Sequence, residues 1–414
     1  MSSSGRFAPA VLAFLAVFLP RPATAQLVLG QYEEEAPLRT WNTFPFVPAA
    51  ALGRGETTLA ATGEPAAVLA NPALLFSLPR FGLGLGGSLQ SASLLKYGPV
   101  NTGIFLTDGP LFLTVPAADS LIFTARGGRW ALAAGLSLAE IHDRPTTEYA
   151  SESRGIVQYR VRFEQTGILR VFSLSAGYRL GPRWSLGLGL NYASGSRDRS
   201  FREEWTASRI TITDEKSEKQ TGFYLQGGVV WEPGPKLRLA AVLRAPYGRN
   251  VNRRSRVAYA SPALPDGIVI SGQAEDRVSQ PLAVGLGGRL GISSRLAAFA
   301  DLVWSDWPSY EVRWFEGREK RDFKGVLKAG LGLEYGLRFG LFGAQAEMPV
   351  RLGLSHDPQP MKTPSSSYLG VTTGLGLRWR GFRLDLGLLA SRESGSGDGL
   401  RGTRAALSLE YGFE

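Results

Sequence analysis

Side chains that could do covalent or redox chemistry are few in this chain of 414 residues. It has two histidines, His142 and His356, and no cysteine. The run 355–357 (SHD) reads like a catalytic triad, but neighbouring residues on a strand point to opposite faces, whereas a triad assembles in space. Two distant histidines make a poor metal site, and a chain without cysteine cannot depend on thiolate chemistry. We therefore expect no enzyme activity, no cofactor and no metal.

The glycine-rich stretch 82–87 (GLGLGG) spells the G-x-G-x-x-G pattern of dinucleotide-binding loops. That fingerprint requires a strand before it and a helix after it. Here it lies in a run that alternates large apolar residues with glycine, and such a run produces the pattern by chance. We interpret it as a β-strand with one apolar face.

The same alternation recurs along the chain and ends with 407–413 (LSLEYGF). Behind a secretory signal, such strands have one face toward lipid and one toward a polar lumen. We predict an all-β membrane protein, an antiparallel transmembrane β-barrel of about 14 strands plugged by a small, partly helical N-terminal hatch. The expected strands lie near 81–91, 129–140, 156–166, 167–180, 183–195, 219–232, 236–248, 268–277, 280–291, 294–306, 326–338, 340–354, 367–380, 381–391 and 402–413.

The N-terminus carries the pattern of a secretory signal peptide. Arg6 gives a positive start, residues 9–19 are apolar, and small residues at 23–25 (ATA) precede Gln26. The predicted organisation is a signal peptide at 1–25, a hatch at 26–80 and a barrel at 81–414. An exported barrel of this kind indicates the bacterial outer membrane.

Residues 26–80 do not alternate, which separates them from the rest of the chain. They hold an acidic cluster at 33–35, a proline-interrupted aromatic stretch at 41–48, and small-residue segments that end at Asn71-Pro72. Proline disfavours helical geometry in the residue before it, so this pair marks a boundary. A compact segment ahead of a barrel indicates a plug.

Connections between the expected strands are of two kinds. Tight breakers occur at 180–183, 232–235 and 380–381, and long polar connections are expected at 196–219, 249–266, 356–366 and 393–403. This alternation is typical of short periplasmic turns and longer extracellular loops.

The formal net charge is +10. No basic stripe interleaved with stacking aromatics is present, so we expect no nucleic-acid partner. Eight charged residues alternate with apolar neighbours on the expected lumen face, where most would pair across strands and hold the plug, and a minority would select an anionic headgroup. They are Arg289, Asp301, Lys328, Glu334, Arg351, Arg378, Arg383 and Asp385.

The segment 66–75 (AAVLANPALL) resembles the hatch motif of the FadL/TodX family, outer-membrane transporters of long-chain fatty acids and hydrocarbons. Its core is Asn71, Pro72 and Ala73. Further stretches similar to that family are 280–287 (QPLAVGLG) leading to 301–307 (DLVWSDW), 351–354 (RLGL) with Pro358 and Pro360, and 384–387 (LDLG).

The resemblance implies a monomeric barrel, folded by the barrel assembly machinery and surrounded by outer-membrane lipid. It would take a hydrophobic molecule into an apolar pocket and release it sideways through the wall, under control of the hatch. Candidate pocket residues are Leu69, Leu74, Leu75 and Phe76, for which ordinary packing of the plug is the alternative.

Two other functions stay open from the sequence. One is a barrel that carries or shuttles protein cargo, as secretion-system barrels related to this family do. A general polar porin is the third possibility, disfavoured because such pores usually lack an N-terminal plug.

Overall fold

A computed structural model describes residues 44–94, 104–105, 111–153, 156–314, 317–320, 322–363, 365–395 and 400–413. The expected signal peptide and residues 26–43 of the expected hatch lie outside this part. The strands are β1 (Phe81–Leu94), β2 (Ile104–Phe105), β3 (Leu111–Gly127), β4 (Trp130–Ile141), β5 (Arg144–Ser153), β6 (Ile156–Arg179), β7 (Trp184–Trp205), β8 (Ile210–Gly234), β9 (Leu237–Arg244), β10 (Tyr247–Ser261), β11 (Leu264–Gln280), β12 (Ala283–Gly291), β13 (Leu296–Ser305), β14 (Glu311–Trp314), β15 (Gly317–Lys320), β16 (Val326–Leu341), β17 (Ala344–Pro358), β18 (Ser367–Trp379), β19 (Phe382–Ser394) and β20 (Arg401–Phe413).

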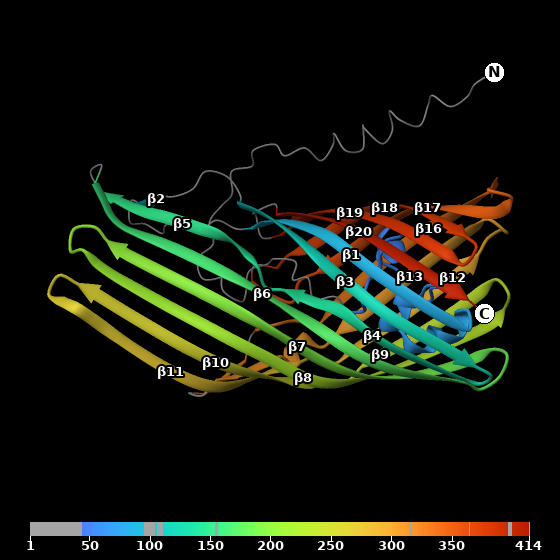
Figure 1. Ribbon diagram of the computed structural model, residues 1–414, viewed down its shortest axis with the longest axis horizontal. Coiled ribbons are helices and arrows are strands. Elements are labelled where there is room, and N and C mark those ends of the chain that lie inside the picture. Colours follow the sequence, from blue (N-terminus) through green and yellow to red (C-terminus); the bar gives the residue numbers. More distant parts are fainter. Residues whose placement is uncertain are drawn as a thin grey trace, which may run out of the picture.

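These strands form one closed antiparallel barrel, in which the first and last strands pair from Phe81↔Phe413 to Ala92↔Gly402. Five wall strands consist of two consecutive pieces each, namely β4 with β5, β9 with β10, β11 with β12, β13 with β14 and β15 with β16. The two-residue β2 pairs only with β5 and does not count as a separate wall strand. The wall therefore has 14 strands, which confirms the predicted fold class and strand number. Figure 1 shows the wall closed around the N-terminal helical turns.

The outer surface of the barrel is apolar over one band. On β7, Leu186, Leu188 and Leu190 are exposed and alternate with residues that face the interior. Aromatic pairs border this band, with Trp184 stacked on Trp231 at one edge and Tyr192 tilted against Phe223 at the other. Lipid-facing bands of bacterial barrels are flanked by aromatic girdles in the same way and are about 25 Å tall.

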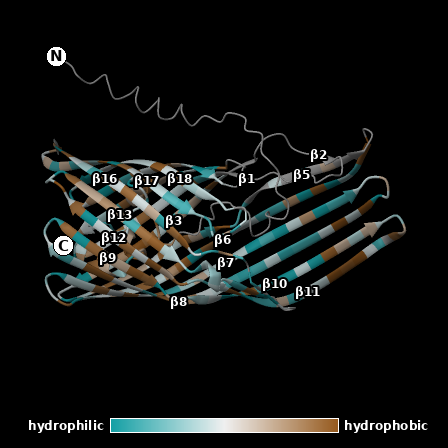
Figure 2. Cartoon of the chain, turned by 180° about the vertical axis from the view of Figure 1, so that it is seen from behind, coloured by the Kyte–Doolittle hydropathy of each residue, from teal (hydrophilic) through white to brown (hydrophobic). Residues whose placement is uncertain are grey.

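Beyond the Tyr192–Phe223 girdle, the strands β6, β7, β8, β10 and β11 continue as a tall polar extension (Figure 1). Figure 2 shows apolar bands on the crossing strands of the barrel and mostly hydrophilic residues along the extension. Cross-strand ion pairs such as Arg256–Glu215, with 3.1 Å between nitrogen and oxygen, join its strands. None of the helices in the described ranges has the length and apolar character that a membrane-crossing helix requires.

The short turns between β3 and β4, β6 and β7, β8 and β9, β12 and β13, β16 and β17, and β18 and β19 all lie at one end of the barrel, which we call the short-turn end. The pair Phe81↔Phe413 places the start and the finish of the wall at this end too. Both ends of the wall therefore lie at one end of the barrel, as an even number of antiparallel strands requires.

Residues 44–80 form a plug inside the barrel, near the short-turn end (Figure 1). The plug contains α2 (Ala49–Leu52) and two 3-10 helices, η1 (Pro65–Leu69) and η2 (Pro72–Ser77). Proline begins both 3-10 helices, where its missing N–H costs nothing. Their apolar side chains pack into one buried cluster with Ile122 of β3 and Val242 of β9.

Inward-facing glycines of the wall let the plug backbone approach closely. A Cβ on Gly332 would lie 2.1 Å from the carbonyl oxygen of Arg54, and one on Gly353 would lie 2.1 Å from the nitrogen of Gly55. Such distances are impossible for a real Cβ, so any larger residue must displace backbone. In the alternating strands, the inward glycines thus make room for the plug backbone, and the large apolar residues face lipid.

Four neighbouring wall strands are interrupted at the same height, along a line that we call the seam. It runs through residues 245–246, 281–282, 306–310 and 322–325. On one side of it lie the pieces β9, β12, β13 and β16, and on the other side lie β10, β11, β14 and β15. Pro246, Pro281 and Pro308 lie in it, and proline cannot donate to a ladder.

The structure corrects several expected strands and loops. Residues 196–219 and 249–266, expected as polar loops, are strands of the tall extension with short turns, because ladder bonds and ion pairs hold them where both faces meet water. The expected strands 156–166 and 167–180 are a single strand, β6. Strands β3 and β5 were not expected, since Pro116 and Asp119 hide the alternation in β3.

The close contact between wall glycines and plug backbone, which we call the glycine seat, predicts that one added methyl group on β16 lowers stability at some positions and not at others. Gly332→Ala should destabilise the plugged barrel by about 1–3 kcal/mol, the usual range for overpacking, because the new Cβ meets plug backbone. The matched control is Gly340→Ala on the same strand, where a Cβ meets nothing within 4 Å. Urea unfolding in detergent, followed by tryptophan fluorescence, measures both, and equal midpoints would contradict the proposed seat.

Candidate functional site

The Asn71-Pro72-Ala73 motif joins two parts of the plug and seats them on the wall. The Asn71 side chain is fully buried; its Nδ2 donates to the carbonyl oxygen of Leu59 at 2.9 Å, and its Oδ1 accepts from the Ala73 N–H at 3.1 Å. The wall residue Gln226 donates to the Ala70 carbonyl oxygen at 2.5 Å. These bonds give the motif a structural role at the centre of the plug.

A buried arginine, Arg54, ties the two halves of the plug together. Its two terminal nitrogens bind the Glu64 carboxylate in a bidentate pair at 2.7 and 2.8 Å, and its guanidinium lies over the Phe299 ring of the wall at 4.5 Å. Burial alone would raise the pKa of Glu64, but Arg54 and Arg383 outweigh it and hold the pKa below its usual value. Glu64 is therefore ionised at neutral pH.

The ion pairs continue from the plug across the wall. Arg383 lies 3.4 Å from Glu64 and 3.0 Å from Asp385, and Arg351 lies 2.7 Å from both Asp385 and Glu334. Arg378 extends the chain, at 2.8 Å from Glu334. Five of the eight lumen charges expected from the sequence thus meet in one network with the plug.

The other three lumen charges form no ion pair with that network. Lys328 pairs with Glu56 of the plug at 3.3 Å. Asp301 accepts from the backbone N–H groups of Thr58 and Leu59 at 2.6 and 2.9 Å. The buried Nε of the Arg289 side chain has no hydrogen-bond partner among the described residues.

The four residues expected to line an apolar pocket lie in the contact between plug and wall. Leu69 and Phe76 are 8% exposed, and Leu74 and Leu75 are 1% exposed. Leu69 reaches Gly135 of β4, and Leu75 and Phe76 reach Gly177 of β6. Other residues line the three cavities that lie on the outer surface of the barrel, on the tall extension and at the short-turn end. A role of these four residues in binding therefore stays a prediction.

The wall is interrupted beside β3. The β3–β4 ladder runs from Gly127↔Trp130 and stops at Ser120↔Ser137, whereas the β1–β3 ladder continues to Leu94↔Leu111. Within the described residues, the segment 111–119 therefore has a ladder on its β1 side and none toward β4 or β5. We call this the wall gap.

A bulge and a buried ion pair mark the start of the wall gap. The β1–β3 register shifts between Gly86 and Gly87, which makes Asp119 an extra residue on β3. Asp119 accepts from the Ser88 hydroxyl at 2.7 Å and pairs with Arg404 of β20 at 2.7 Å, with both charged side chains 4% exposed. Arg404 also donates to the carbonyl oxygen of Val47, so the bulge is linked to the plug.

An apolar groove of about 660 Å³ lies on the outer surface beside the gap. Its floor is built from small residues of β1, β3 and β20, among them Gly86, Ala118 and Ala406. The exposed side chains of Leu85 and Leu89 border it within the lipid-facing band. The groove and the gap together are the candidate functional site.

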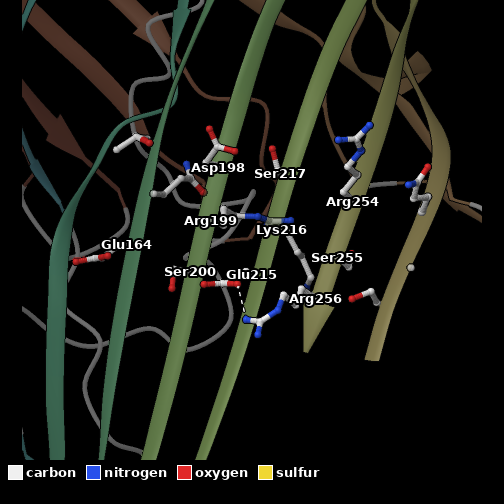
Figure 3. Close-up of a pocket in the computed structure, with 15 residues that line it drawn as sticks. Glu164, Asp198, Arg199, Ser200, Glu215, Lys216, Ser217, Arg254, Ser255 and Arg256 are labelled. Carbon is white, nitrogen blue, oxygen red and sulfur yellow. Dashed lines mark hydrogen bonds and ion pairs between the residues drawn. The ribbon is translucent and has the colours of Figure 1, made fainter. Parts of the chain in front are cut away.

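The largest of the three cavities, about 730 Å³, lies on the tall extension (Figure 3). Its lining is polar, with Glu164, Asp198, Arg254 and Ser271 from four strands, and the Arg256–Glu215 pair bridges β10 and β8 within it. Charged and hydroxyl groups favour water or polar ligands over an apolar molecule. No group of three or more histidine, aspartate or glutamate side chains in the described ranges could hold a metal ion.

The sequence analysis missed Arg54, Glu64, Asp119 and Arg404. Arg54 lies between two glycines, a local signal for close backbone approach, and Arg404 alternates with apolar residues in the last strand. Asp119 gave no signal because its strand had not been found. Asp119 and Arg404 pair across 285 positions of the chain, which no local pattern reports.

No family model and no curated protein matches this sequence. Solved structures do match. The monoaromatic hydrocarbon channel CymD has a TM-score of 0.64 at 15% identity, over 90% of this chain and 99% of the channel.

Two further structures are similar to the same extent. A FadL homologue from Pseudomonas aeruginosa has a TM-score of 0.62 at 14% identity, over 91% of this chain and 99% of its own. The Pseudomonas putida toluene transporter TodX has a TM-score of 0.62 at 16% identity, over 90% of this chain and 100% of its own. The chain therefore has the fold of the FadL- and TodX-type outer-membrane channels, a plugged barrel of 14 strands.

Proposed function

We propose that this protein is a passive outer-membrane transporter for hydrophobic small molecules, which enter from outside and leave sideways through the wall gap. The carrying observation is the β3–β4 ladder that stops at Ser120↔Ser137, beside an apolar groove in the lipid-facing band. The fold is shared with proteins described as hydrocarbon channels and a toluene transporter, which supports the same class of solute.

Membrane physics favours a lateral route at this place. An unpaired strand edge is costly in hydrocarbon, and irregular backbone at membrane depth is tolerated where it lines a passage. An apolar solute gains roughly 25 cal/mol per Å² of surface removed from water, so it gains by moving from the gap into the groove and the bilayer. Transfer of this kind runs down a gradient and needs no energy source.

The plug closes the direct route and controls the lateral one. Its bidentate Arg54–Glu64 pair and its glycine seat hold it across the lumen near the short-turn end, which lies on the periplasmic side in this proposal. The contact of Arg404 with both Val47 and Asp119 connects the start of the plug to the bulge. Movement of the plug would therefore displace Arg404 and the bulge at the start of the wall gap.

Mass spectrometry of apolar molecules that copurify with the barrel in mild detergent tests the proposal directly. A fatty acid or hydrocarbon retained by the intact protein, and lost when residues 64–76 are deleted, is the expected result. A clean barrel that elutes with a polypeptide would favour the cargo-carrying function and overturn this one.

Deletion of 64–76 also gives a functional prediction. The segment carries Glu64 and the Asn71-Pro72-Ala73 motif, so its loss removes the plug's main attachments and opens the lumen. We expect larger single-channel conductance in planar bilayers, sensitivity of cells to bulky antibiotics, and loss of specific hydrophobe uptake. Unchanged sensitivity together with unchanged uptake would contradict the role of the plug.

Removal of the bulge should close the lateral route and leave the barrel intact. Deletion of Asp119 takes the extra residue out of β3, so the strand can continue its regular ladder toward β4. We expect uptake of a radiolabelled apolar solute to fall at least about tenfold while conductance stays low. A single deletion at Ala207, in the turn between β7 and β8, is the control, and normal uptake by the Asp119 deletion would exclude the wall gap as the exit.

A further inference from the structure

The third cavity opens at the short-turn end and has a volume of about 360 Å³. It lies between plug residue Thr62, Pro182 of the β6–β7 turn, and residues at the end of β8 and the start of β9, namely Glu232, Gly234, Pro235 and Leu237. Two arginines line it, Arg238 of β9 and Arg289 of β12.

These two arginines are direct cross-strand partners, Arg289↔Arg238, in the β9–β12 ladder. Like charges directly opposite one another destabilise a sheet. Arg238 has compensating partners, since it pairs with Glu232 at 2.5 Å and donates to the Ala61 carbonyl oxygen at 2.6 Å. Glu232 is the one acidic residue of the lining, so the cavity keeps an excess positive charge.

Arg289 carries that excess. Its guanidinium lies 5.9 Å from the centre of the Phe299 ring, and its buried Nε has no hydrogen-bond partner among the described residues. Arginine presents five N–H donors in a planar fork that matches phosphate and carboxylate oxygens. Exposed Lys236 and Arg183, in the two turns that border the cavity, add to the positive potential at its mouth.

We propose that this cavity binds a phosphate group, held by Arg289 with help from Arg238. Phosphate offers more oxygens than a carboxylate, enough to bind the fork of Arg289 and the remaining donor capacity of Arg238 at once. Soluble phosphate and the headgroup of a phospholipid in the adjacent leaflet are the two sources of such a group. Both sources share the same chemistry at Arg289.

The experiment is isothermal titration calorimetry on the full chain in dodecyl maltoside, with inorganic phosphate and dihexanoyl phosphatidic acid as separate probes and acetate as the carboxylate. We expect at least one phosphate probe to bind, and to bind more tightly than acetate. Binding of inorganic phosphate identifies a site for soluble ligands as well, whereas binding of the lipid probe alone identifies a headgroup site.

Arg289→Gln should weaken the bound probe by about tenfold, or 1.4 kcal/mol. Arg289→Lys, which keeps the charge and loses the fork, should weaken it less. The matched control is Arg295→Gln, an exposed arginine in the β12–β13 turn at the same end, and it should bind like the natural chain. The proposal is overturned if neither phosphate probe binds, if acetate binds equally well, or if Arg289→Gln and Arg295→Gln have equal effects. Equal heat-modifiability on gels shows that each variant is folded.

Discussion

Hydrogen bonding of every peptide group within the hydrocarbon is the constraint on which this structure depends. Closure of the sheet through β1 and β20 meets it around nearly the whole wall. At the wall gap one strand edge lacks these ladder bonds, and nearby residues reduce the cost of that loss. Asp119 turns inward to Ser88 and Arg404 instead of facing lipid, and proline at position 116 removes one donor from the segment that lacks a ladder on one side.

The width of the barrel explains why the lumen needs a plug. A barrel of this width has a lumen that side chains alone do not fill, and here small plug residues and inward glycines meet backbone to backbone. Contacts this close leave little room for water, so the charges among them must pair. Arg54, Glu64, Arg383 and Asp385 do so in a continuous chain. Breaking such a pair by removing one member leaves a buried charge without compensation, which is far more costly than loss of a surface pair.

The strands at 183–195 and 381–391 could be predicted from the sequence because alternate residues face lipid and the polar lumen and therefore differ in polarity. It failed in 196–219 and 249–266, because both faces of the tall extension meet water and the contrast disappears. It also failed at β3, whose extra residue shifts the alternation. For the candidate site, the lumen charges were found from their spacing. Their partners in the plug depend on contacts between residues more than a hundred positions apart.

The seam gives the barrel an uneven stiffness. A continuous ladder resists bending because every hydrogen bond along it must distort together. Along the seam the regular ladder is broken in four neighbouring strands, and single backbone bonds such as the one from the Asp306 N–H to the Leu282 carbonyl oxygen, at 2.9 Å, remain. Aromatic rings fill the interruption, with Trp307, Tyr310 and Phe323 in mutual contact. Rings that slide on one another tolerate small rotations better than a ladder does. Small rotations of the upper pieces β11, β14 and β15 would therefore pivot on β10, whose ladder with the uninterrupted strand β8 holds them to the rest of the barrel.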